Sequence, residues 1–154
     1  GRSCGGWMTM VLLARYPNIV AGGISYVPEC YGRLTKAYKV KKIGVEEALK
    51  KFRKKDGSGP ADMRKMQIDE IKKSDNLPVL VFTHPKDPFG GLVSDWVERI
   101  SGVERIVVSE DNKVNGKSCK VWGESIKDFH DIDRATCFKE FNPKILNFIN
   151  SKLN

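Results

Sequence analysis

A serine, a carboxylate and a histidine in this sequence could together perform nucleophilic catalysis. Ser3 lies in Gly1-Arg2-Ser3-Cys4-Gly5, which fits the pattern Gly-x-Ser-x-Gly. In this pattern a strand turns sharply into a helix, and the turn lifts the serine oxygen out of the sheet. Because the serine backbone is strained there, side chains two positions before and after it would collide with their surroundings. We therefore expect Gly1 and Gly5 to be sterically required, and Gly6 to let the helix pack closely.

A serine becomes a strong nucleophile when a histidine accepts its proton and a carboxylate orients that histidine. In the strand-to-helix architecture the chain order is serine, acid, histidine, with the acid after a late strand and the histidine before the last helix. Asp87 follows the apolar run from Pro78 to Thr83, and His130 precedes the C-terminal helix. We predict these two as acid and base. His84 comes before the acid and is interpreted as a loop histidine.

Other acidic residues lie closer to the candidate base in the sequence. Asp128, Asp131 and Asp133 flank His130 and could orient its ring locally. Neighbours in sequence seldom provide the buried partner of a histidine Nδ1, so Asp87 is preferred. The backbone N–H of Cys4, at the start of the predicted helix, is the expected donor to an oxyanion.

The elements that must position these residues alternate between apolar runs and helical patterns. Strands are predicted at 19–27, 78–83 and 105–108, with an extended segment at 119–122. Helices are predicted directly after Ser3 and at 45–55, 61–74 and 92–100, with a last helix starting near Asn142-Pro143. Such alternation is typical of an α/β fold with a mainly parallel sheet. The three strands are expected to be parallel neighbours.

Composition indicates a globular chain. Of 154 residues, 40% are hydrophobic and 30% are charged, which suits one domain spanning 1–154. No apolar run of about 18 residues is present, so no membrane span is predicted.

The net charge of +8 is concentrated in one segment. Residues 33–76 contain 14 basic and 7 acidic residues, a net charge of +7, without a stacking series of aromatic residues. We interpret this segment as a basic insertion of two helices that covers the active-site side, with lysines facing outward and no nucleic-acid partner.

The four cysteines lie at positions 4, 30, 119 and 137. They form no C-x-x-C pair, and their spacings match no zinc module. They are predicted to be free thiols in a reducing cytoplasm, although one disulfide remains open.

The segment Gly1 to Thr9, with Ala14-Arg15-Tyr16-Pro17 behind it, resembles the catalytic domain of the prolyl oligopeptidase family. The branch that holds acylaminoacyl peptidases and dipeptidyl peptidases is the most similar. The run Pro78 to Val81 leading to Asp87-Pro88 is similar to that family's acid loop, and His130 falls where its base does. The chain departs from the family at Cys4, where a tyrosine is usual, at residues 84–86 and in the surroundings of His130.

The resemblance implies the C-terminal part of an α/β-hydrolase domain, incomplete at its N-terminal side. It implies a serine peptidase that cleaves short or acylated peptides through an acyl-enzyme, without metal or cofactor. A β-propeller, the early hydrolase strands and a second oxyanion donor would precede Gly1. A carboxylesterase or polyester depolymerase shares the same residue order, and a catalytically silent interaction module is the remaining alternative.

Overall fold

The computed structural model describes residues 1–30, 43, 45–50, 52–87, 95–111, 113–120 and 128–153. At its centre is a parallel sheet in the order β1-β2-β3, formed by β1 (Gly23–Tyr26), β2 (Val79–Thr83) and β3 (Val103–Val107). The predicted parallel pairing of these three strands is confirmed. Together with the helices, this sheet gives a mixed α/β architecture.

The first strand is shorter than predicted. Residues 17–19 form a turn, and Ile19 is 81% exposed, so the apolar run there does not mark a strand. The free edge of β1 is instead paired over its end by the first residues of the chain. Tyr26 N–H donates to Gly1 O at 2.8 Å, and Ser3 N–H donates to Tyr26 O at 2.9 Å. Residues 1–3 thus run parallel beside β1 and occupy part of its edge.

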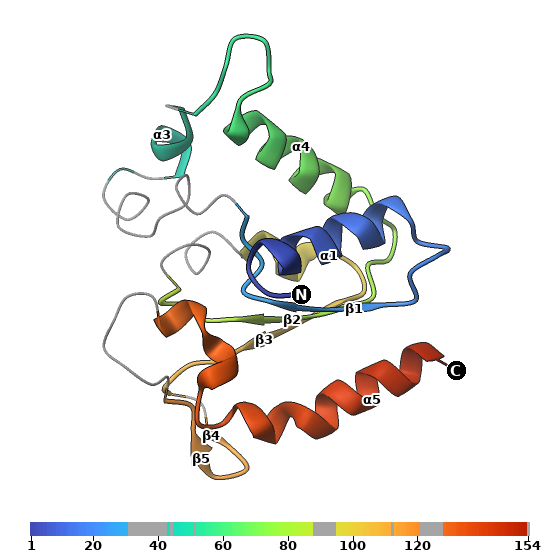
Figure 1. The fold of residues 1–154 in the computed structure, drawn as a ribbon, viewed down its shortest axis with the longest axis vertical. Coiled ribbons are helices and arrows are strands. Elements are labelled where there is room, and N and C mark those ends of the chain that lie inside the picture. Colours follow the sequence, from blue (N-terminus) through green and yellow to red (C-terminus); the bar gives the residue numbers. More distant parts are fainter. Residues whose placement is uncertain are drawn as a thin grey trace.

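Helices cover both faces of the sheet (Figure 1). On one face α1 (Cys4–Arg15) lies beside α4 (Pro60–Lys72), and α5 (Asn142–Leu153) lies on the opposite face. The helix predicted from Asn142-Pro143 is confirmed, as is the helix after Ser3. The short α3 (Val45–Lys50) and α4 are the two helices expected in the basic insertion, while residues 31–42, 44 and 51 lie outside the described ranges.

Strand β2 contributes to two hydrophobic cores, and all five of its residues are buried. Val79 and Val81 pack in a core with α1 residues such as Trp7. Leu80 and Phe82 pack in the other core, which includes Val27, Val108, Ile132 and Phe141. This two-sided burial explains why β2 is a continuous apolar run rather than an alternating one.

Two predicted elements after β2 differ in the structure. Of the helix predicted at 92–100, the described part is a 3₁₀ helix, Asp95–Arg99. The segment predicted as extended at 119–122 is preceded by a two-stranded hairpin of β4 (Lys113–Val114) and β5 (Lys117–Ser118), and residues 121–127 lie outside the described ranges. Short 3₁₀ helices follow at Asp128–His130, Ile132–Arg134 and Phe138–Phe141.

The prediction of four free thiols is wrong. The structure pairs Cys4 with Cys30 and Cys119 with Cys137. Sequence spacing could not reveal these pairs, because each joins segments that come together only when the chain folds. The expectation of a reducing cytoplasm rested on free thiols and loses that support. Within the described ranges, no helix has the length and apolar character needed to span a membrane.

Candidate active site

Ser3 occupies the turn between the segment paired with β1 and the start of α1. Its φ is 53° and its ψ is −123°, a conformation that non-glycine residues rarely adopt. The turn is held on both sides, since Ser3 N–H donates to Tyr26 O and Trp7 N–H donates to Ser3 O at 3.0 Å. Local strain of this kind persists only where the surrounding hydrogen bonds enforce it, and it concentrates at functional sites.

The glycines around Ser3 do not all have the role that we predicted. A Cβ on Gly1 would collide with the carbonyl group of Gly5, so Gly1 is sterically required as expected. A Cβ on Gly5, by contrast, would meet no described atom within 4 Å, and the steric requirement predicted for this residue is wrong. On Gly6 it would lie 2.7 Å from Ser25 Oγ and 2.9 Å from Tyr26 O, so Gly6 is the residue that permits the close approach of α1 to β1.

The structure brings the predicted acid and base together across 43 residues. Asp87 follows β2 in a turn in which its N–H donates to His84 O at 3.0 Å. Its Oδ1 lies 2.9 Å from Nδ1 of His130, and the two side chains are 2% and 13% exposed. Because Nδ1 faces a carboxylate, the proton of a neutral imidazole is favoured on Nδ1, and Nε2 is left as the basic nitrogen.

The neighbouring acids make other contacts. Asp131 Oδ1 lies 3.1 Å from Arg2 Nη1, and Asp133 Oδ1 lies 3.5 Å from the same nitrogen. These contacts link the residue before Ser3 to residues directly after His130. They therefore place the serine turn and the histidine segment side by side.

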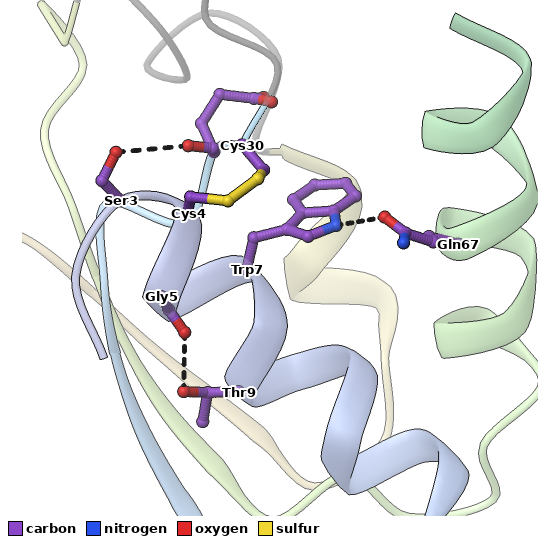
Figure 2. Close-up of a disulfide and its surroundings, with 8 residues drawn as sticks. Ser3, Cys4, Gly5, Trp7, Thr9, Cys30 and Gln67 are labelled. Atoms are coloured by element: carbon purple, nitrogen blue, oxygen red, sulfur yellow. Dashed lines mark hydrogen bonds between the residues drawn. A yellow bond between two sulfur atoms is a disulfide. The ribbon is translucent and has the colours of Figure 1, made fainter. Parts of the chain in front are cut away.

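The hydroxyl of Ser3 donates to the carbonyl oxygen of Glu29 at 3.3 Å (Figure 2). A serine hydroxyl has one proton, so in this arrangement that proton points to a peptide oxygen and not to a base. The hydroxyl would have to leave this acceptor, by rotation about the Cα–Cβ bond to another staggered position, before its proton could be given to a base.

Glu29 is fixed by contacts that the sequence did not reveal. Its carboxylate lies 3.2 Å from Nη2 of Arg64 on α4, and both side chains are almost fully buried. Cys30, the next residue, is bonded to Cys4 at the start of α1 (Figure 2). Trp7 Nε1 on α1 donates to Gln67 Oε1 on α4 at 2.6 Å. Helix α4 therefore contacts both α1 and Glu29, the residue that accepts the hydrogen bond of Ser3.

The side chain of Cys4 is joined in a disulfide, so this position carries no nucleophilic thiol. Its backbone N–H lies in the first turn of α1, before the first helical hydrogen bond at Trp7, where N–H groups lack partners within the helix. This is the location expected for the oxyanion donor.

His84 is buried beside the acid and is a loop residue, as interpreted. Its Nδ1 accepts the N–H of Lys86 at 3.0 Å, and its ring lies 4.8 Å from that of Phe129. Burial and the nearby Lys86 charge lower the pKa of His84, which keeps the ring neutral. Its Nε2 has no hydrogen-bond partner among the described residues.

No family model, curated protein or solved structure matches this chain. In the part of the chain that the structure describes, no group of three or more His, Cys, Asp or Glu side chains could hold a metal ion.

Proposed function

We propose that this chain carries the catalytic residues of a serine hydrolase, with Ser3 as nucleophile, His130 as base and Asp87 as the acid that orients it. The observation that carries the proposal is the strained backbone of Ser3 at a junction between an extended segment and a helix. Such strain is the signature of a nucleophile elbow. The buried pair of Asp87 and His130 supports it, because the two residues are far apart in sequence and meet with the geometry a base requires.

The chemistry would be covalent acyl transfer. His130 Nε2 takes the proton of Ser3 as Oγ attacks a substrate carbonyl, and Asp87 stabilises the imidazolium that forms. The backbone N–H of Cys4 donates to the developing oxyanion. His130 then passes the proton to the leaving group, which departs to leave an acyl-enzyme, and water releases the acid by the same steps in reverse order.

The resemblance to the prolyl oligopeptidase family favours short or acylated peptides as substrates and an α/β-hydrolase fold. It also suggests that upstream hydrolase strands and a β-propeller complete the protein and supply a second oxyanion donor. An esterase acting on carboxylic or polymeric esters would use the same residues. The contact of Ser3 with Glu29 favours the further alternative, a catalytically silent interaction module. In this contact the Ser3 hydroxyl is hydrogen-bonded to a peptide carbonyl, which cannot act as a base.

A fluorophosphonate probe tests the proposal, because only an activated serine reacts readily with it. Intact mass and peptide mapping should show one adduct, on Ser3. Ser3→Ala should remove the adduct, and His130→Gln should slow its formation by about 1000-fold or more. Ser58→Ala, which changes an exposed serine in a turn, is the matched control and should label like the unchanged protein.

An acyl-peptide anilide and a p-nitrophenyl ester, compared on the protein that reacts with the probe, separate peptidase from esterase. Faster turnover of the anilide relative to spontaneous hydrolysis supports the peptidase. Absence of an adduct on Ser3, or an equal rate in the His130→Gln variant, would contradict a serine hydrolase and favour the catalytically silent interaction module.

A further inference from the structure

Arg2 is the variable position between Gly1 and Ser3, and the elbow pattern itself places no demand on its side chain. Its backbone is nevertheless well fixed. Hydrogen bonds to Tyr26 on both sides hold residues 1–3 parallel to β1, and Arg2 forms a bridge with Tyr26. The backbone from which the Arg2 side chain extends is therefore fixed directly beside Ser3.

The guanidinium reaches the segment that carries the base. Its Nη1 lies 3.1 Å from Asp131 Oδ1 and 3.5 Å from Asp133 Oδ1. Asp131 follows His130 directly and precedes the 3₁₀ helix Ile132–Arg134. One arginine thus bridges two carboxylates that lie more than 125 positions away in the sequence and within three residues of the base.

Contacts with other parts of the fold also hold the histidine segment. His130 is bonded to Asp87, which extends from β2, and Ile132 is fully buried in the core on the α5 face. These contacts fix the histidine relative to the sheet. The distance between the base and the nucleophile depends in addition on how the segment sits against the serine turn, and Arg2 makes that contact.

We propose that Arg2 is a positioning residue that holds the segment bearing His130 against the turn bearing Ser3. Its effect on the reaction rests on the proposed function, whereas its effect on the segment does not. Arginine suits this role because its guanidinium is always charged and its nitrogens hold a fixed planar geometry, with Nη1 between the two carboxylates.

The size of the effect has physical bounds. The pair is partly exposed, and one exposed ion pair corresponds to no more than about a fivefold change in an equilibrium. Misplacement of a reacting group by about 1 Å can slow a reaction about a hundredfold. Arg2→Ala removes two partly exposed ion pairs, so labelling of Ser3 should slow by more than about 2-fold and by no more than about 25-fold.

The chain offers a close control for charge alone. Arg134 also contacts Asp131, at 3.8 Å, but lies in the same segment and three residues away, so it does not bridge to the serine turn. Arg134→Ala removes one positive charge beside Asp131 and should leave the labelling rate within twofold of the unchanged protein. Arg2→Lys should recover part of the lost rate. Slowing by Arg134→Ala equal to that by Arg2→Ala would overturn the proposal.

Two further measurements complete the test. With Asp131→Asn and Asp133→Asn already present, Arg2→Ala should cost little more, because the contacts it removes are gone. Backbone hydrogen exchange over residues 130–135 should be several-fold faster in Arg2→Ala and unchanged in Arg134→Ala. The exchange measurement does not depend on the reactivity of Ser3. If Ser3 of the unchanged protein is never labelled, the serine hydrolase is refuted, and hydrogen exchange alone tests whether Arg2 holds the histidine segment. Equal exchange in all variants would refute that role of Arg2.

Discussion

Ser3 donates its hydroxyl proton to the main-chain oxygen of Glu29, and this bond defines the resting arrangement of the site. The acceptor is held in place by the ion pair of its own side chain with Arg64 and by the disulfide at the next residue. In the proposed reaction, activation of Ser3 therefore begins with the loss of this well-supported hydrogen bond. Ser3 would exchange the peptide oxygen of Glu29 for the imidazole of His130 as its hydrogen-bond acceptor.

Replacement of Asp87 by Asn should abolish most of the reactivity of Ser3. The asparagine amide has nearly the same volume but favours the imidazole form with its proton on Nε2, which cannot accept the serine proton. Labelling by the fluorophosphonate should fall about 1000- to 10,000-fold. Asp131→Asn, which changes a carboxylate adjacent to His130, should have a much smaller effect. A larger loss in Asp131→Asn would mean that the local acid orients the base.

Two neighbouring glycines of α1 should respond in opposite ways to alanine. Gly5→Ala meets open space in a helix and should stabilise the protein by about 0.5–1 kcal/mol through helix propensity. Gly6→Ala brings a Cβ to 2.7 Å from Ser25 Oγ and should destabilise it by about 1–3 kcal/mol. Urea unfolding of both variants measures the difference. A stabilised Gly6→Ala would show that α1 does not approach β1 so closely.

The sequence predicted three parallel neighbouring strands, and its signal is strongest at β2, which is a continuous apolar run because it is buried on both faces. The same rule failed at Ile19, where apolar residues lie in an exposed turn. The pattern also predicted that Asp87 and His130 lie together, since the elbow prescribes their order along the chain, and the structure shows that contact. It could not identify Arg2, Glu29 and Arg64 as contacts of the site, because these pairings depend on how α4 and the histidine segment pack.

The two disulfides should be detectable by peptide mapping without reduction. Four cysteines allow three pairings, and the map should contain only Cys4 with Cys30 and Cys119 with Cys137. The cysteines are 26 and 18 positions apart, so loss of either bond by paired serine substitutions should lower the free energy of unfolding by about 3 kcal/mol. Alkylation of four thiols in the native protein would contradict both bonds.

The titration of His84 should make the protein less stable as the pH falls. The folded state lowers the pKa of His84, mainly by burial and then by the charge of Lys86, from its ordinary value of 6.5. Below about pH 6.5, His84 therefore binds a proton in the unfolded chain but less readily in the folded chain, so the free energy of unfolding decreases as the pH falls. His84→Asn retains an acceptor for the Lys86 N–H and cannot titrate.

Urea unfolding of the His84→Asn variant and the unchanged protein at pH 7.5, 6.5 and 5.5 isolates this effect. The free energy of unfolding of the unchanged protein should decline relative to the variant below pH 6.5. A difference that stays constant over this range would show that His84 titrates equally in both states.

Because two cores share β2, the site is intact only while the layers on both faces of the sheet are folded. Ser3 directly precedes the helix that packs in one core, and the segment of His130 is anchored through Ile132 in the other. Asp87 follows the strand between them. Opening of either layer would separate Ser3 from His130 while the other layer stayed folded. On heating, labelling of Ser3 should therefore be lost at the melting temperature of the less stable layer. The backbone amides of β2 should still exchange slowly above that temperature.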